Sequence, residues 1–260
     1  MRNDAIKLEE ARLTGETDIE FPVVHERHRA FPAVFENRQH KRVLDLAAGV
    51  GYVARNVRDQ YQTNMFCNDI SPSCLKSLRQ LGLPVTSYTL DHNVAGFPFK
   101  DGSFDALIAL ATIEHIINVD LFVEEVYRIL DDDGYFYVSA PNYASLLYLY
   151  EIVWTGRTFH NPLGKETSYE FYAHVRYFTY RTLLEYLSTF GFVPDAVYTP
   201  LPKDSTRYQA IQASSPLKAF MFRQTMNFLY HLSPRWSSEP IICFRKTTSK
   251  STSKFRKVIL

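Results

Sequence analysis

From about residue 40 to residue 140, the chain alternates short apolar runs with segments whose apolar residues recur at three- and four-residue spacing. Short apolar runs bounded by turn residues are typical of buried strands, and the longer spacing is typical of helices. The alternation therefore predicts β–α–β units around a parallel sheet. The expected strands are Arg42–Ala47, Met65–Asp69, Val85–Leu90, Phe104–Ala111 and Tyr135–Ala140.

Helix signals support this reading and continue beyond it. Ser71-Pro72 is an N-cap followed by proline at the first helical position. Thr179 is also an N-cap residue, and a second helical apolar pattern follows it. Two further strands are expected at Phe192–Tyr198 and Ile241–Arg245. The elements of the second half are less regular and enclose two inserts, residues 143–176 and 203–239.

Composition limits the class of protein. The chain has 260 residues, 46% hydrophobic and 22% charged, and a formal net charge of +1. These values are typical of an ordinary globular protein, and they exclude a disordered chain, a collagen and a strongly basic nucleic-acid binder. We expect no signal peptide and no membrane span, and the three cysteines show no metal-type spacing, which favours a reducing, cytoplasmic location.

The basic charge is concentrated at the C-terminus. Residues 245–260 hold six basic residues and no acidic one, so removing them from the total of +1 leaves −5 on the rest of the chain. The sequence predicts three regions: a helical or lid segment at 1–40, one domain with two inserts at 41–246, and a flexible basic tail at 247–260.

The main candidate for ligand chemistry is the turn after the first strand. Gly49 and Gly51 allow the backbone to approach a ligand closely, and Asp45 places a carboxylate beside them. Together with Ala54, these glycines also satisfy the dinucleotide pattern G-x-G-x-x-G/A, so an NAD-dependent oxidoreductase has to be considered. Asp69 follows Gly49 by 20 residues at the end of the second strand, where a carboxylate can accept ribose hydroxyls in either fold.

Further motifs occur in a fixed order along the chain. They are Asp45 four residues before Gly49, Asn68-Asp69-Ile70-Ser71, Asp91, Phe97-Pro98-Phe99, Ile113-Glu114-His115-Ile116, Ser139-Ala140-Pro141-Asn142 and His174-Val175-Arg176-Tyr177-Phe178-Thr179. Together they resemble the class I S-adenosylmethionine-dependent methyltransferases, in the broad small-molecule branch. The resemblance implies an α/β fold: a Rossmann-like, doubly wound seven-stranded sheet with an antiparallel last strand, here with a helical cap formed by the two inserts.

The resemblance also implies how S-adenosylmethionine is held. Asp45 and the loop to Gly51 would receive the methionine moiety, Asp69 the ribose and Ile70 the adenine. Asp91 would accept from the adenine amino group, and backbone carbonyls near Ala109 and Leu110 would accept from the methionine ammonium. Ala47 departs from the glycine that the family usually has. The predicted cofactor residues are Asp45, Ala47, Gly49, Gly51, Asp69, Ile70, Asp91, His92, Ala109 and Leu110.

His115 is the candidate for acid–base catalysis. An imidazole titrates near neutral pH, and this one lies at the carboxyl end of a strand, where the acceptor should bind. The alternative is a histidine that only holds its loop by a hydrogen bond, and His92 and His174 are weaker candidates for the same role. In His25-Glu26-Arg27-His28-Arg29, two histidines three residues apart on a helix could bind a metal, but no partner carboxylate or cysteine cluster accompanies them and the order is not that of His-Glu-x-x-His. We therefore expect a solvated face or a lid over the cofactor cleft there, and no metal in the chain.

The inserts hold the candidate acceptor contacts. Tyr148, Trp154, Tyr172 and His174 are predicted to contact the acceptor, although aromatic residues at helical spacing are more often part of a core. In the second insert, Ser215-Pro216 begins a helix whose apolar face is expected to point inward. That face consists of Leu217, Phe220, Met221, Phe228 and Leu232.

The resulting prediction is methyl transfer from S-adenosylmethionine to a small-molecule, glycan or lipid-linked acceptor, at oxygen. The alternatives are an NAD-dependent oxidoreductase and a non-catalytic nucleotide-binding module. A nucleic-acid methyltransferase is disfavoured because the body is acidic and only the tail is basic. Peripheral membrane contact through the second insert and the tail stays open, with a solvated tail as the simpler alternative; the oligomeric state is not predicted.

Overall fold

The computed structural model describes residues 10, 25–91, 96–158, 160–163, 168–247 and 254–260 of the chain. In this described part, eight strands form one sheet in the order β3-β2-β1-β4-β5-β7-β6-β8. The strands are β1 (Arg42–Asp45), β2 (Asn64–Asn68), β3 (Val85–Thr86), β4 (Phe104–Leu110), β5 (Leu130–Ser139), β6 (Phe192–Thr199), β7 (Ile241–Lys246) and β8 (Arg256–Ile259).

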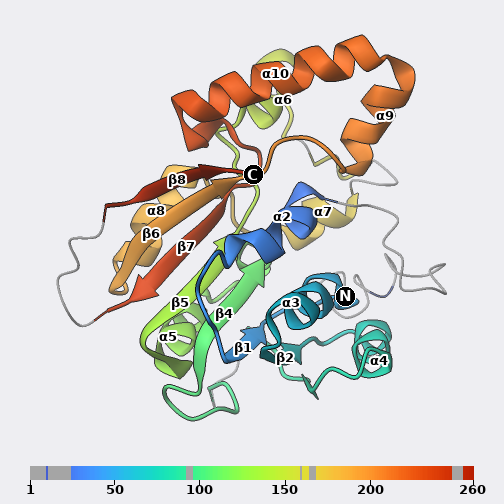
Figure 1. The fold of residues 1–260 in the computed structure, drawn as a ribbon. Coiled ribbons are helices and arrows are strands. Elements are labelled where there is room, and N and C mark those ends of the chain that lie inside the picture. The colour runs from blue at the N-terminus through green and yellow to red at the C-terminus, as the bar shows by residue number, and fades with distance from the viewer. Residues whose placement is uncertain (1–9, 11–24, 92–95, 159, 164–167, 248–253) are drawn as a thin grey trace.

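Helices flank this sheet and form a separate group at one end of the molecule (Figure 1). The α-helices are α2 (Glu26–Val34), α3 (Tyr52–Tyr61), α4 (Pro72–Gln80), α5 (Val119–Ile129), α6 (Leu146–Thr155), α7 (Ser168–Ala173), α8 (Tyr180–Ser188), α9 (Thr206–Ser214) and α10 (Pro216–Leu232). Two short 3-10 helices are η1 (Ile113–His115) and η2 (Pro234–Trp236).

Strand direction follows the prediction. β1 to β5 are parallel to one another, β7 is antiparallel to both β5 and β6, and β8 is parallel to β6. All strands but β7 therefore end at the same edge of the sheet, which is where open α/β sheets bind ligands. The predicted doubly wound α/β fold with an antiparallel strand is confirmed, with eight strands rather than seven.

The sheet is buried on both faces. Along β4, Leu107 belongs to one hydrophobic cluster and Ile108 to another, because successive strand side chains point to opposite faces. Phe122 of α5 packs in the first cluster and Val57 of α3 in the second. The two clusters hold the carboxyl ends of β1 and β4 next to each other, with Asp45 paired in register with Ile108.

A buried amide just after β5 binds the second insert and the start of α8. Nδ2 of Asn142 donates to the carbonyl oxygens of Arg235 and Ser237, each at 2.7 Å, and its Oδ1 accepts the Tyr180 N–H at 2.9 Å. Asn142 is fully buried. These bonds fix where the first insert leaves the sheet and where the second returns to it.

The sheet differs from the prediction at two places. β3 ends at Thr86 instead of Leu90, because the Asn68 side chain takes both the N–H and the carbonyl of Tyr88. The tail contains a strand that was not expected: β8 pairs with β6 from Arg256↔Ala196 to Ile259↔Thr199. The prediction of a flexible tail is therefore wrong for residues 256–259.

The helix of the second insert also differs from its prediction. Ser215 caps α10 as expected, by accepting the Lys218 N–H. Its apolar face, however, does not point inward, and Leu217, Phe220, Met221, Phe228 and Leu232 are all exposed. The inward side is instead made by Ala219 and Tyr230. Among the described residues, no helix combines the length and the apolar character needed to cross a bilayer.

Candidate active site

The turn after β1 is built from two glycines in the left-handed region. Gly49 has φ 56° and Gly51 has φ 90°, a backbone conformation that L side chains rarely adopt. A Cβ on Gly51 would also lie 2.8 Å from Cδ2 of Leu78 and 2.9 Å from Cδ1 of Leu81. Gly51 is thus needed both for the turn and for the packing of α4 against it.

Asp69 connects this turn to the end of β2. Its Oδ2 accepts the Gly49 N–H at 2.8 Å, and its Oδ1 accepts the Ser71 N–H at 2.9 Å. The Ala48 N–H donates to the carbonyl of Asn68 at 3.0 Å, which adds a backbone link between the same segments. The structure brings the predicted methionine and ribose residues together at one place.

Asp45 lies under the same turn and is buried. Burial and the charge of Asp69 raise the pKa of Asp45 to about 7. A hydrogen bond from the Ala47 N–H lowers this pKa, but by less than burial and Asp69 raise it. Ala47 itself is exposed at the sheet edge, and Ile70 is half-buried. Burial disfavours the charged form of this carboxyl, so a cationic group beside it would be stabilising.

Asp91 has a structural task in addition to its predicted one. Its two carboxylate oxygens accept the N–H groups of Ile117 and Asn118, each at 3.0 Å. It thereby fixes the loop between η1 and α5, and contact with adenine stays a prediction. His92 lies outside the described residues.

The end of β4 is held by β5. Ala109 is fully buried, Leu110 is half-buried, and the Ala111 N–H donates to the Ser139 carbonyl at 3.0 Å. Ala111 has φ 49°, so the chain turns sharply as it leaves β4. That turn leads directly into η1, which carries Glu114 and His115.

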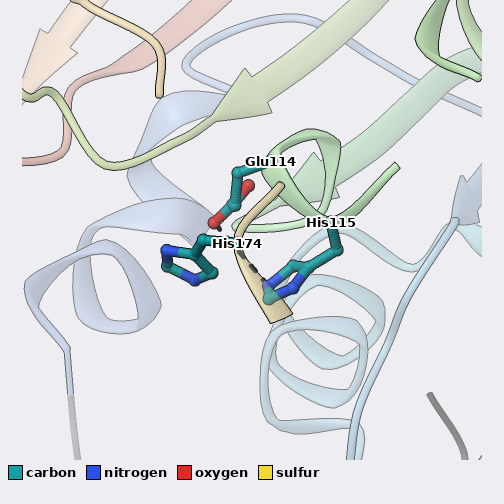
Figure 2. A group of neighbouring side chains, drawn as sticks. All are labelled: Glu114, His115 and His174. Carbon is teal, nitrogen blue, oxygen red and sulfur yellow. Dashed lines mark ion pairs between the residues drawn. The ribbon is translucent and has the colours of Figure 1, made fainter. Parts of the chain in front are cut away.

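Three side chains meet beyond this turn: Glu114, His115 and His174 (Figure 2). Nε2 of His115 lies 3.9 Å from Oε1 of Glu114, and the rings of His115 and His174 have centroids 4.7 Å apart. Nδ1 of His115 contacts the carbonyl of Ala173 at 3.1 Å. The backbone completes the arrangement, because the N–H groups of Val175 and Arg176 both donate to the Glu114 carbonyl.

A tyrosine and a third histidine extend this cluster. The Tyr143 hydroxyl lies 2.6 Å from Nε2 of His160 and 3.1 Å from Nδ1 of His174, and the rings of His160 and His174 are 4.7 Å apart. Burial and the neighbouring histidines lower the pKa of His174 to about 3, so this ring is neutral. His115 and His174 were predicted from the sequence, whereas their neighbours Tyr143 and His160 were not, since no motif spacing joins them.

The predicted acceptor residues separate into two groups. Tyr148 of α6 is buried and packs on Tyr143 with ring centroids 4.6 Å apart, so it lies beside the histidine cluster. Trp154, on the same helix, is 74% exposed, and Tyr172 is also exposed. α6 therefore has one side toward the cluster and another toward solvent.

The histidine-rich run before β1 packs against the second insert. Oε1 of Glu26 accepts the N–H groups of Lys203, Asp204 and Ser205, and Arg27 pairs with Glu239. His28 packs its ring against Tyr52 of α3. Through these contacts α2 connects α3 to the second insert.

Comparison with known proteins decides the family. A family model described as a methyltransferase domain matches residues 19–197, which is more than half of the chain. The chain belongs to this methyltransferase family. The resemblance to class I S-adenosylmethionine-dependent enzymes is confirmed, and the family and fold imply S-adenosylmethionine as the cofactor of the methyltransferase.

Relatives of the chain differ in the chemistry that their names state. The chain is 28% identical over 103 residues to malonyl-[acyl-carrier protein] O-methyltransferase of Geobacter sulfurreducens, a match covering 39% of each chain. It is also 28% identical over 93 residues to human mitochondrial arginine-hydroxylase, covering 36% of this chain and 26% of that one. The chain thus spans well under half of the length of these two relatives.

A solved structure of an S-adenosylmethionine-dependent methyltransferase from Thermotoga maritima superposes with a TM-score of 0.58 and 18% identity. The match covers 85% of this chain and 89% of that one. At this identity the likeness shows the fold of the chain and nothing about an acceptor.

The residues present fit the implied cofactor. S-Adenosylmethionine offers an ammonium group and ribose hydroxyls as donors, and the turn after β1 presents the carboxylates of Asp45 and Asp69 as acceptors. The raised pKa of Asp45 is consistent with a site completed by a positive charge. The methyltransferase family assignment also favours this cofactor over NAD, which the glycine pattern alone had left open.

Proposed function

We propose that the chain transfers a methyl group from S-adenosylmethionine to an oxygen atom of an acceptor bound next to His115. The supporting observation is the position of His115, which follows β4 at the same sheet edge as Asp45 and Asp69. The donor turn and a group able to assist an acceptor hydroxyl thus belong to neighbouring strands.

The reaction is a displacement at the sulfonium methyl carbon. The acceptor oxygen forms a bond to this carbon, the carbon–sulfur bond breaks, and its electron pair stays on sulfur. The hydroxyl proton passes to Nε2 of His115. That nitrogen has a lone pair in the neutral ring, because Nδ1 donates its proton to the Ala173 carbonyl.

Alignment is the larger contribution that we assign to the protein. The donor is already activated by its positive charge, and well-oriented reactants gain about 7 to 11 kcal/mol over free encounter. Asp45 and Asp69 would hold the donor, and Tyr148 and His174 would contact the acceptor at the histidine cluster. The roles of Ala47, Gly49, Gly51, Ile70, Asp91, Ala109 and Leu110 remain those predicted from the sequence.

The acceptor class that we favour is a lipid-linked molecule at an anionic membrane surface. α6 exposes Tyr150, Val153 and Trp154 on the side opposite to Tyr148, and α10 exposes the apolar face described above. α9 and α10 together carry Arg207, Lys218 and Arg223 and no acidic residue. Apolar and aromatic side chains beside basic ones are the composition that binds anionic interfaces.

The test begins with the donor and then identifies the acceptor. Calorimetry should show binding of S-adenosylmethionine and of S-adenosylhomocysteine but not of NAD. The protein is then incubated with methyl-labelled donor and with separate lipid and aqueous fractions of cell extract, and products are analysed by mass spectrometry. We expect a labelled methyl ether or ester in the lipid fraction.

A paired variant tests the role of His115. His115→Ala should lower turnover while leaving donor affinity nearly unchanged, and His231→Ala, at an exposed position on α10, should leave both unchanged. A labelled methyl group on carbon or nitrogen would contradict transfer to oxygen, and label only in the aqueous fraction would contradict a lipid-linked acceptor. A product that gains oxygen instead of a methyl group would contradict methyl transfer itself.

A further inference from the structure

The cluster after β4 holds the residue types of a metal centre. Glu114, His115 and His174 can each direct one ligand atom so that these atoms all lie within 4.8 Å of one another. Figure 2 shows the three neighbouring side chains on two segments, Glu114 and His115 on η1 and His174 on the segment after α7. Two histidines and one carboxylate form the ligand set of several catalytic metal sites, which keep further positions open.

Each of the two histidines has its Nδ1 within hydrogen-bond distance of a neighbour, which orients the ring and sets its tautomer. The Ala173 carbonyl can only accept, so Nδ1 of His115 carries the proton and Nε2 holds the lone pair. Tyr143 has one hydroxyl proton. If it donates along the 2.6 Å contact to His160, it accepts from Nδ1 of His174 at 3.1 Å, and Nε2 of His174 holds the lone pair.

This pattern matches the surroundings that orient metal-bound histidines. Such histidines almost always donate their second ring N–H to a carbonyl, a carboxylate or another polar partner, which fixes the tautomer and the ring direction. Here Ala173 and Tyr143 supply these partners for His115 and His174. The structure therefore provides the supporting contacts as well as the ligands.

The buried charge of Glu114 and the exposure of His115 to solvent are both compatible with a bound cation. The Glu114 side chain is only 1% exposed, and burying a carboxylate costs free energy that a nearby positive charge offsets. The adjacent His115 side chain is 29% exposed, so the cluster is reachable from solvent. A divalent ion could enter past His115 and offset the charge of Glu114.

We propose that Glu114, His115 and His174 together bind one divalent transition-metal ion at the acceptor side of the site. Imidazole ligands favour Zn²⁺, Fe²⁺ and similar ions, whereas Mg²⁺ and Ca²⁺ prefer an all-oxygen set. Two ligand atoms at about 2.1 Å from one ion lie about 3 to 3.5 Å apart, so small side-chain rotations would close the present spacing.

In the metal-loaded chain Nε2 of His115 would be a ligand, so the ion would activate the acceptor there, and the proton transfer to Nε2 described above would apply to the metal-free chain. A bound cation lowers the pKa of an acceptor hydroxyl, whose proton can then leave to solvent before the oxygen attacks the methyl carbon. Only this step rests on the proposed methyl transfer. Metal binding itself depends on neither the donor nor the acceptor.

The experiment measures binding by the full chain after removal of metals with a chelator. Titration with Zn²⁺ by calorimetry, and with Co²⁺ by visible absorption, should give one equivalent per chain. Glu114→Gln, His115→Ala and His174→Ala should each weaken the affinity by about 100-fold or more. His231→Ala, an exposed histidine outside the cluster, is the matched control and should bind as the wild type does.

A second variant tests the geometry without removing a ligand. Tyr143→Phe deletes only the hydroxyl next to His174 and should weaken metal affinity by about 10- to 100-fold, as is usual for the partners of metal-bound histidines. This variant also keeps the test usable if a buried substitution such as Glu114→Gln prevents folding, which thermal melting of the metal-free proteins would reveal.

Two results would overturn the proposal. One is the absence of a bound equivalent in the wild type at micromolar metal. The other is binding that Glu114→Gln, His174→Ala and Tyr143→Phe leave unchanged, which would place the ion elsewhere, for example at His25 and His28. Because the readout requires no turnover, a failure of the methyl-transfer proposal would leave this result intact and recognisable.

Discussion

Asp69 shows how one side chain can shape a turn and also serve a ligand. Its oxygens already accept the N–H groups of Gly49 and Ser71, and each oxygen has a second lone pair for a ribose hydroxyl. Charge-assisted hydrogen bonds contribute about 1.5 to 3 kcal/mol each, and about 1.4 kcal/mol is tenfold in affinity. We expect Asp69→Ala to weaken S-adenosylmethionine binding by about tenfold or more.

Calorimetry with S-adenosylmethionine measures the loss of affinity expected for Asp69→Ala. Asp59→Ala, at an exposed position with an ion pair to Arg58, is the control that removes a carboxylate elsewhere. If Asp69→Ala bound the donor normally, Asp69 would have only the task of holding the turn.

Asp45 leads to a prediction about pH. Its pKa in the folded chain is about 7, above the ordinary value of 3.8, because burial and Asp69 disfavour the charged form. A raised pKa contributes stability that is fully present below the unfolded value and is lost as the pH rises through about 7. In the absence of donor, Asp45→Asn should therefore melt at a higher temperature than the wild type at pH 8.

The difference should shrink as the pH falls to 5.5, since the wild-type carboxyl is then protonated. Saturating donor should reverse the order at pH 8, because the cationic ligand favours the charged carboxylate. Thermal melting of both proteins at the two pH values, with and without donor, measures this. A difference independent of pH would show that Asp45 is ionised throughout the range.

At the scale of elements, the sequence predicts best where a single residue sets the boundary. Ser71 and Thr179 cap α4 and α8 as expected, because their side chains satisfy N–H groups a few residues away. The limits of β3 were wrong because a side chain distant in sequence, Asn68, competes for the backbone of Tyr88. Local patterns do not report such contacts.

The α10 prediction failed for a different reason. Helical spacing of Phe220, Met221 and Phe228 correctly indicates an apolar face, but spacing does not say what covers that face. In the described structure it faces solvent. The same limit applies to the site: the motif contained Glu114 and His115, but only the fold brings His174 and Tyr143 to them.

The exposed face of α10 carries its own prediction. Replacing Phe220 and Met221 by Ser should reduce co-sedimentation with vesicles containing anionic phosphatidylglycerol by several-fold, because apolar area is the main attraction to the interface. Gln224→Ala, at an exposed polar position on the same helix, should have no effect. Binding should fall with added salt, since Lys218 and Arg223 attract the anionic lipids.

Two other results would count against a membrane surface. Equal binding of the double variant and the wild type would show that α10 does not contact lipid. Self-association of the wild type in solution, removed by the same substitutions, would show that the face binds a second copy of the chain instead.

At the scale of the whole molecule, ion pairs connect segments from opposite ends of the chain. Arg38 pairs with Asp195 of β6, and Arg256 of β8 pairs with both Glu36 and Asp195. Arg256 is the basic partner from the tail, and its two acidic partners lie in the body, which gives the charge asymmetry of the sequence a structural role. A flexible tail was predicted because Ser, Thr and Lys dominate it, but its last residues are apolar and reach the sheet.

β8 should therefore contribute to the stability of the whole fold. The Leu201 N–H donates to the Leu260 carbonyl, and the Leu260 N–H donates to the Thr199 carbonyl. Val258 and Leu260 pack against the hydrophobic cluster that contains Ile108 and Val57. Partial burial of these two side chains and the lost pairing suggest about 2 to 3 kcal/mol. Deleting residues 247–260 should lower the melting temperature by about 5 to 10 °C for a chain of this size.

Lys257→Ala is the control for that deletion, because Lys257 is exposed on β8 and its loss removes a charge while keeping the strand. We expect its melting temperature to stay within about 1 °C of the wild type, as for most exposed substitutions. If the deletion also left the melting temperature unchanged, β8 would contribute nothing to folding. If Lys257→Ala lowered it as much as the deletion does, charge rather than strand pairing would be what joins the tail to the acidic body.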